Sequence, residues 1–330
     1  MSSKYSNINL DSCKLIRDEK EIEGNFTSVV GEYAIPGMEK TGFFKENGCA
    51  VYEANNDENA RELLASEIME IIGMPHADII IAQNEEMKGC FSINVLEKDE
   101  SFVEVNVLKK GYGFSNNIQD FIQKDSEFMK NIGCASEDFL NQRRKYILKV
   151  LYVCALLGNQ DIKDDNIKPI INVKTKELRN SPCYDFATSF SQHKQEITEF
   201  NITSRDLMIE LFKNYYEDIE ELAKSTYNNL TKEKIEEIMS DSMFIEIFGT
   251  EYNNVKANLG DMCKLNEELY IIKKISELQK QQTKSIKKHG ISLEDIKKIY
   301  NNVDITSKDN IARMMNYLQS EKESKNNEQC

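Results

Sequence analysis

The chain lacks several patterns on which common binding sites depend. Its eight cysteines include no pair at C-x-x-C spacing, which argues against a zinc knuckle. Its three histidines, His76, His193 and His289, lie far apart in the sequence and indicate no histidine-based metal site or nucleophile. Positive charge is scarce, since 42 Lys and Arg face 56 Asp and Glu and the formal net charge is -14. Sequence-independent nucleic-acid binding rests on clustered Lys and Arg, so we expect no direct nucleic-acid partner.

Long apolar runs are missing as well. The first twenty residues are polar and charged, without an apolar core of signal-peptide length. No segment approaches the roughly 20 apolar residues of a membrane-spanning helix. Cys90 and Cys154 lie in apolar runs, which predicts buried free thiols in a reducing compartment. We therefore expect a cytoplasmic protein with no membrane partner, although an effector exported by a signal-independent route would show the same features.

The pattern of apolar residues and turn signals indicates a β-rich part followed by a helical part. The chain is long enough for two lobes. Asn47 and Gly48 separate apolar runs at 41–45 and 49–53, which predicts a hairpin. Residues 58–72 carry an apolar stripe at helical spacing, and strands are predicted at 77–82 and 90–96.

Helical patterns dominate after residue 136. Residues 146–157 are nearly all apolar, which predicts a buried helix, and an apolar run at 167–173 followed by a polar turn predicts a hairpin. Thr231, Ser292 and Thr306 suit helix N-cap positions. A polar tail at 322–330 is expected to be disordered. Further helices are predicted at 204–225, 231–248, 253–288, 292–302 and 306–321.

The most informative polar residues follow the buried helix. Residues 161–166 read D-I-K-D-D-N, and Asp185 stands between two aromatic residues. Phosphoryl transfer from ATP needs such groups: Asp161 can accept the proton of an acceptor hydroxyl, while Asn166 and Asp185 can hold metal ions against the phosphates. The competing interpretation is a polar loop at a helix end, with solvated carboxylates.

These motifs resemble the HipA-like kinases, and the resemblance spans most of the chain. The stretch L-G-N-Q-D at 157–161 is similar to the family's catalytic loop, and S-P-C-Y-D at 181–185 is similar to its metal-binding segment. E-K-T at 39–41 resembles its small-lobe signature, and Glu62 occupies the place of its small-lobe helix glutamate. The chain is short for the family and is more similar to its compact CtkA-type branch of serine/threonine protein kinases.

The resemblance implies an α+β, bilobal, protein-kinase-like fold. A small β-rich N-lobe is expected at 1–97 and a mostly helical C-lobe at 98–321. ATP would bind between the lobes, beside a hinge at Val95 and Leu96.

The resemblance also implies the reaction, which is ATP- and Mg²⁺-dependent transfer of the γ-phosphate to a serine or threonine hydroxyl of a protein. Asp161 would be the catalytic base, and Asn166 and Asp185 the Mg²⁺ ligands. Lys163, where the family usually has histidine, would offset negative charge on the transferring phosphate. Self-phosphorylation is expected in the loop that contains Thr27 and Ser28. Such kinases often belong to toxin–antitoxin systems or are exported effectors, so an antitoxin or a host protein is the expected partner.

One position departs from the family pattern. Glu53 stands where the family places its ATP-anchoring lysine, and a carboxylate facing Glu62 and phosphates would be repulsive. Lys45, on the facing strand of the predicted hairpin, and Lys40 are the candidate replacements. The alternatives are that Lys45 is a solvated edge-strand lysine and the chain a pseudokinase that holds nucleotide without transferring phosphate, or that the chain is a helical interaction protein.

Overall fold

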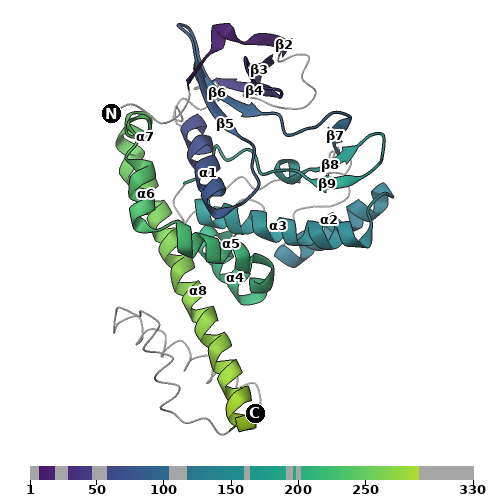
Figure 1. Ribbon diagram of the computed structural model, residues 1–330, viewed down its shortest axis with the longest axis vertical. Helices are drawn as coiled ribbons and strands as arrows, with labels where there is room; N and C mark the ends of the chain where they lie inside the picture. The colour runs from purple at the N-terminus through teal and green to yellow at the C-terminus, as the bar shows by residue number, and fades with distance from the viewer. Residues whose placement is uncertain are drawn as a thin grey trace. The chain divides into compact units, whose positions relative to one another are not determined.

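A computed structural model describes residues 7–18, 29–46, 58–103, 117–159, 164–190, 196–197 and 202–289 (Figure 1). The chain forms two compact units, Met1–Glu267 and Glu268–Cys330. The boundary between them falls inside the last described helix, α8 (Tyr252–His289). No described helix combines the length and the apolar character needed to cross a membrane.

The first part of the larger unit is a six-stranded sheet with the order β1-β5-β6-β4-β3-β2. Strands β1 and β5 are parallel, and the other neighbours are antiparallel. Helix α1 (Glu58–Ile72) lies between β4 and β5 in sequence. The strands are β1 (Asn7–Asn9), β2 (Lys14–Asp18), β3 (Val29–Ala34), β4 (Thr41–Glu46), β5 (Ile79–Gln83) and β6 (Lys88–Ile93).

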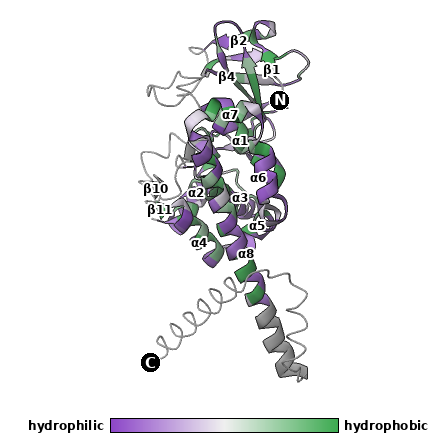
Figure 2. Cartoon of the chain, turned by 90° about the vertical axis from the view of Figure 1, so that its left-hand side faces the viewer, coloured by the Kyte–Doolittle hydropathy of each residue, from purple (hydrophilic) through white to green (hydrophobic). Residues whose placement is uncertain are grey.

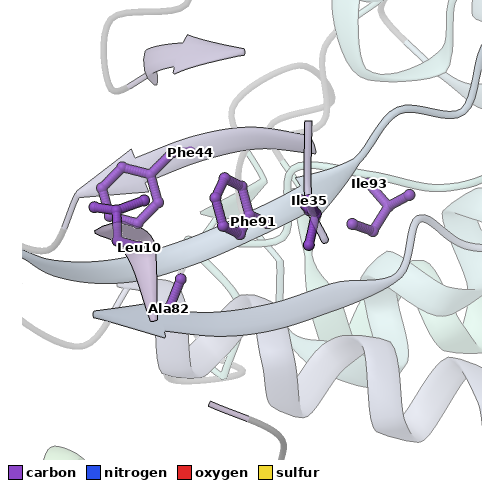
Figure 3. Packing of buried hydrophobic residues seen from close by; sticks show 6 residues of the cluster. All are labelled: Leu10, Ile35, Phe44, Ala82, Phe91 and Ile93. Atoms are coloured by element: carbon purple, nitrogen blue, oxygen red, sulfur yellow. The ribbon is translucent and has the colours of Figure 1, made fainter. Parts of the chain in front are cut away.

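One face of this sheet carries an apolar cluster, shown in Figure 3. Phe44 of β4 and Phe91 of β6 are register partners, and their ring centroids are 5.3 Å apart. Successive side chains of a strand point to opposite faces, so the residue after Phe44 must point away from this cluster. That residue is Lys45. The cluster consists of Leu10, Ile35, Phe44, Ala82, Phe91 and Ile93.

The second part of the larger unit is mostly helical. Its central helix is α3 (Glu137–Leu157), whose residues from Ile147 to Leu157 are nearly all buried. Ser136 caps its start by accepting a hydrogen bond from the Phe139 amide, and Gly158, at φ 62°, ends it. The other helices are α2 (Ile118–Ile132), α4 (Ser204–Asn214), α5 (Tyr216–Asn229), α6 (Lys232–Met239) and α7 (Ser242–Phe248).

Short strands connect the sheet with these helices. Strand β8 (Pro169–Asn172) pairs with β7 (Glu100–Phe102) on one side and with β9 (Leu178–Asn180) on the other. A turn of 3-10 helix, η3 (Asp164–Ile167), precedes β8. The remaining short elements are η1 (Leu10–Ser12), η4 (Gly249–Glu251), β10 (Glu196–Ile197) and β11 (Ile202–Thr203).

The helices are amphipathic, and Figure 2 shows hydrophilic and hydrophobic residues on the same helices in this part. Helix α4 buries Leu207, Met208, Leu211 and Phe212, which recur at helical spacing. This face packs toward α3, where the rings of Phe212 and Tyr152 lie 6.5 Å apart. The apolar periodicity of the sequence therefore reflects packing around α3.

Most predicted elements are confirmed. Residues 58–72 form α1, and residues 146–157 form the end of α3. The apolar run predicted at 167–173 contains β8, which forms a hairpin with β9, and residues 253–288 lie in α8. Cys90 and Cys154 are buried free thiols, and Thr231 caps α6.

Some predicted helices were wrong in extent. The predicted helix at 204–225 is two helices, because Tyr215 leaves helical geometry at φ -133° and ψ 20°. The predicted helix at 231–248 is also two, because Asp241 caps a new helix by accepting from the Met243 amide. The strand predicted at 49–53, the helices at 292–302 and 306–321 with Ser292 and Thr306, and the tail at 322–330 lie outside the described residues.

Candidate active site

A buried ion pair joins the sheet to α1. The Lys45 ammonium Nζ lies 2.6 Å from Oε1 of Glu62. Only 14% of the Lys45 side chain and 2% of the Glu62 side chain are exposed. Lys45 points to this face because strand alternation sends its neighbour Phe44 to the opposite one. Since β4 lies between β3 and β6, the interpretation of Lys45 as a solvated edge-strand lysine is wrong.

The charge on each of these two side chains shifts the pKa of the other. Burial alone would lower the pKa of Lys45, but the carboxylates of Glu62 and Asp185 outweigh it and raise that pKa. Burial raises the pKa of Glu62, and the Lys45 ammonium opposes that shift. The second oxygen of Glu62, Oε2, is buried and has no hydrogen-bond partner among the residues that the structure describes. Lys45 is thus held as a cation whose position is set by Glu62.

Neutral polar groups fix the backbone around Lys45. The amide Nδ2 of Asn59 donates to the Lys45 carbonyl at 3.1 Å. The Cys90 thiol, on the strand residue opposite Lys45, donates to Oδ1 of Asn59 at 3.2 Å. Burial and the Glu62 carboxylate raise the pKa of Cys90, so it remains a thiol. A methyl group on Gly89 would lie 2.0 Å from the Lys45 carbonyl oxygen, so only glycine lets β6 approach β4 here.

A second carboxylate, that of Asp185, also lies near the Lys45 ammonium. Its Oδ1 lies 3.7 Å from Nζ of Lys45, and 42% of its side chain is exposed. The predicted hairpin is present as β8–β9, and the chain reaches Asp185 shortly after β9. The amide of Cys183 donates to the Pro75 carbonyl at 2.9 Å, and the amide of Ala77 donates to the Cys183 carbonyl at 2.8 Å. The residues just after α1 therefore hold the strand that delivers Asp185.

Of the three predicted functional residues in the 161–166 motif, the structure describes only Asn166. Asn166 lies in η3, directly before β8, and its side chain is half-buried. Asp161, Lys163 and Glu53 lie outside the described residues, as do Thr27 and Ser28. At the start of the 161–166 loop, Thr188 Oγ1 donates to Oδ1 of Asn159 at 2.5 Å. That bond places Asn159, two residues before Asp161, beside the segment that follows Asp185.

The predicted hinge residues have internal partners. The Val95 carbonyl accepts a hydrogen bond from Nη2 of Arg179 at 2.9 Å. The Leu96 amide donates to Oδ1 of Asn94 at 3.0 Å. Arg179 also donates to both oxygens of Glu100, at 2.7 and 2.5 Å. The hinge segment is thereby tied to β9, the strand that leads to Asp185.

Lys40, the second candidate for an anchoring cation, lies elsewhere. Its Nζ is 2.6 Å from Oε1 of Glu97, next to the hinge, and both side chains are exposed. The sequence analysis did not find Asn59, Arg179 or Glu100. Asn59 carried a usable signal, because residues three apart on a helix share a face and Glu62 follows it at that spacing.

The side chains present fit a magnesium and nucleotide site. Mg²⁺ prefers oxygen ligands and is commonly held by one or two carboxylates together with phosphates. Asp185 offers a half-exposed carboxylate, and the Lys45 ammonium beside it is fixed and charged. Asn166 would be the second protein ligand, as the sequence predicts.

The fold is similar to that of a known kinase. No protein-family model and no curated protein matches the chain. The crystal structure of the Helicobacter pylori proinflammatory kinase CtkA superposes with a TM-score of 0.58 and 13% identity, over 81% of this chain and 99% of that one. HipA of the Shewanella oneidensis MR-1 toxin–antitoxin system, in complex with HipB and its operator DNA, gives a TM-score of 0.45 and 12% identity, over 79% of this chain and 73% of that one. The chain therefore has the α+β, HipA-like kinase fold that its motifs predicted, with a β-sheet lobe and a helical C-terminal region.

Proposed function

We propose that this chain is a Mg²⁺- and ATP-dependent protein kinase that transfers the γ-phosphate to serine or threonine hydroxyls. The observation that carries the proposal is the buried Lys45–Glu62 pair with the Asp185 carboxylate 3.7 Å from the same ammonium. A kinase needs a lysine held by a helix glutamate and an aspartate for metal, and all three must be in place together. The kinase fold supports the same conclusion.

Each of the three side chains has a role that follows from its surroundings. Lys45 supplies a fixed positive charge for nucleotide phosphates, and Glu62 prevents that ammonium from moving into solvent. Asp185, the more exposed of the two carboxylates, would hold Mg²⁺. Bound magnesium would neutralise phosphate charge during transfer.

The base and the second metal ligand come from the sequence motif. Asp161 would accept the proton of the acceptor hydroxyl, Lys163 would offset phosphate charge, and Asn166 would hold metal. The Thr188–Asn159 hydrogen bond supports the role of Asp161, because it places Asn159, two residues before Asp161, beside Thr188, three residues after Asp185.

The lobes and partners are proposed on the same basis. The N-lobe would be residues 1–97 and the C-lobe 98–321, with ATP beside Val95 and Leu96. A protein substrate, an antitoxin or a host protein would be the partner, and the cytoplasm the place of action. Lys45 supplies the cation that Glu53 cannot, which favours an active kinase over the pseudokinase alternative.

Phosphate transfer tests the proposal directly. Purified protein is incubated with γ-labelled ATP, Mg²⁺ and a generic protein acceptor, beside the Asp161→Ala variant. We expect label on serine or threonine in the wild-type reaction and none with the variant. Equal labelling by the variant would refute the role of Asp161. Thermal stabilisation by Mg²⁺ and ATP without any transfer would instead identify a nucleotide-binding module.

A further inference from the structure

The segment from Asp185 to Phe190 has a positive φ angle at each end. Asp185 has φ 65° and Phe190 has φ 63°, whereas non-glycine residues rarely adopt positive φ. A bulky residue such as phenylalanine is a clear outlier there, and its backbone conformation is strained. Phe190 is also only 2% exposed. Such a conformation persists only where the surrounding contacts hold it.

Three helices supply those contacts. Nη1 of Arg61, from α1, donates to the Ser189 carbonyl at 2.5 Å. The Phe190 amide donates to the carbonyl of Leu157, at the end of α3, at 2.5 Å. Nδ2 of Asn258, near the start of α8, donates to the Phe190 carbonyl at 3.1 Å. The backbone of residues 189 and 190 is therefore fixed from several directions.

Arg61 is also braced from its other side. Its guanidinium carbon lies 5.9 Å from the centre of the Phe248 ring, at the end of α7. Helix α7 lies beside α1 in both views of the molecule (Figures 1 and 2). A cation over an aromatic face is attracted by the ring and loses side-chain freedom. Phe248 thus holds Arg61 in the position from which it reaches Ser189.

The neighbour of Arg61 in α1 is Glu62. Adjacent helix residues point in different directions, so one helix holds two separate contacts: Glu62 to Lys45 and Arg61 to Ser189. Because a helix moves as a rigid rod, a shift of α1 that releases Ser189 also displaces the Glu62 carboxylate. The strained segment and the buried ion pair are mechanically connected through these two residues.

We infer that Arg61 is a positioning residue that couples the segment 186–190, and with it the Asp185 carboxylate, to the Lys45–Glu62 pair. Loss of Arg61 removes one of the contacts that hold the strained backbone, so the segment relaxes and Asp185 moves relative to Lys45. This inference rests on the proposed function, because the consequence for magnesium and nucleotide arises at that site.

The test compares Arg61→Ala with Arg61→Lys and with a matched control, Arg144→Ala. Arg144 is likewise an arginine that joins two segments: it donates two hydrogen bonds to Asp218, at 3.0 and 2.9 Å, and so connects α3 with α5, and it touches neither site. Three quantities are measured in the folded proteins: hydrogen exchange of the Ser189 and Phe190 amides, acylation of Lys45 by an amine reagent, and affinity for ATP with and without Mg²⁺.

We expect Arg61→Ala to speed exchange of both amides and acylation of Lys45 by about tenfold, the effect of losing one charged hydrogen bond. Affinity for ATP should fall mainly when Mg²⁺ is present, because Asp185 acts through the metal. Arg61→Lys should recover part of each change, and Arg144→Ala should leave all three at wild-type values. Unchanged exchange and acylation in folded Arg61→Ala would overturn the inference.

The two proposals can fail separately. If the wild-type protein shows no Mg²⁺-dependent nucleotide affinity, the proposed function fails. Exchange and acylation need no nucleotide, so they still decide whether Arg61 couples the segment to Lys45. If nucleotide binds but Arg61→Ala changes none of the three quantities, only the coupling is refuted.

Discussion

Two lysines, one just before β4 and one near its end, form ion pairs of equal length, one exposed to solvent and one buried. Lys45 and Lys40 each lie 2.6 Å from a glutamate oxygen. In the first pair the side chains are 14% and 2% exposed, and in the second 40% and 61%. An exposed pair contributes about 0–1 kcal/mol, whereas breaking a buried pair costs about 3–5 kcal/mol. Burial, rather than distance, separates a candidate catalytic cation from an ordinary surface lysine.

A third ion pair, Arg179–Glu100, lies beside the predicted hinge and is intermediate in exposure. Arg179 is 37% exposed, whereas its partner Glu100 is only 10% exposed. The Glu100 carboxylate also accepts from the Glu97 amide at 2.7 Å. Arg179 therefore ties Glu100 and the Val95 carbonyl to β9, so its contribution is to the geometry of the segment around Val95. The three pairs can be ranked by experiment.

The largest effect is expected for Lys45→Met. The change leaves the Glu62 carboxylate buried without its cation, and we expect a loss of about 3 kcal/mol in the free energy of unfolding. Nucleotide affinity and phosphate transfer should fall below detection, because no described side chain replaces the ammonium. Urea unfolding and ATP titration measure the two effects. A variant that keeps wild-type ATP affinity would remove Lys45 from the site.

The Asp185→Asn variant should lower the affinity for ATP while changing the free energy of unfolding little. The asparagine keeps the size of the side chain but loses the negative charge that we propose holds the metal. Because 42% of the side chain is exposed, we expect the free energy of unfolding to change by less than about 1 kcal/mol. Affinity for ATP should fall on the order of 10–100-fold in the presence of Mg²⁺ and far less in its absence. Equal losses in both conditions would argue against a metal-binding carboxylate.

Sequence patterns predicted features that depend on residues close together in the chain and missed contacts between residues far apart in it. Helix α1 was predicted from spacings of a few residues, and the structure confirms it. The motif at 161–166 rests on the same kind of signal and stays a prediction, because Asp161 and Lys163 lie outside the described residues. The Arg179–Glu100 contact was not predicted, because its partners are far apart in sequence and lie on strands joined only through β8. Helix α2 was also missed, although Asn117 caps its start and Gly133 ends it.

The sequence alone could not decide whether Lys45 or Lys40 is the better candidate for the anchoring cation. Alternation along β4 puts Phe44 and Lys45 on opposite faces, so a core role for Phe44 already implied a different environment for Lys45. Which face α1 covers depends on the order of six strands, and no local pattern encodes that order. The turn before β4 has no such alternation, so the exposure of Lys40 came only from the structure.

Glu100→Gln should change how stability depends on pH. Hydrogen bonds from Arg179 lower the pKa of Glu100 below its ordinary value of 4.5, and burial opposes them. A carboxyl whose pKa is lower in the folded protein stabilises it above its unfolded pKa, and this stabilisation is lost as pH falls through the folded pKa. The Tm of the wild type should therefore exceed that of the variant at neutral pH. The difference should shrink as the pH falls below 4.5 and vanish once the pH lies below the lowered pKa of Glu100 in the folded protein. A difference that stays constant with pH would mean that the charge of Glu100 contributes nothing.

The smallest effect is expected for Lys40→Met, the matched partner of Lys45→Met. The same change at an exposed pair should alter the free energy of unfolding by no more than about 0.5 kcal/mol, because water solvates Glu97 once its partner is gone. ATP affinity should stay within about twofold of wild type, and raising the salt concentration should erase any difference in stability. If Lys40→Met instead abolished nucleotide binding while Lys45→Met did not, the anchoring cation would lie beside the hinge and the buried pair would be structural.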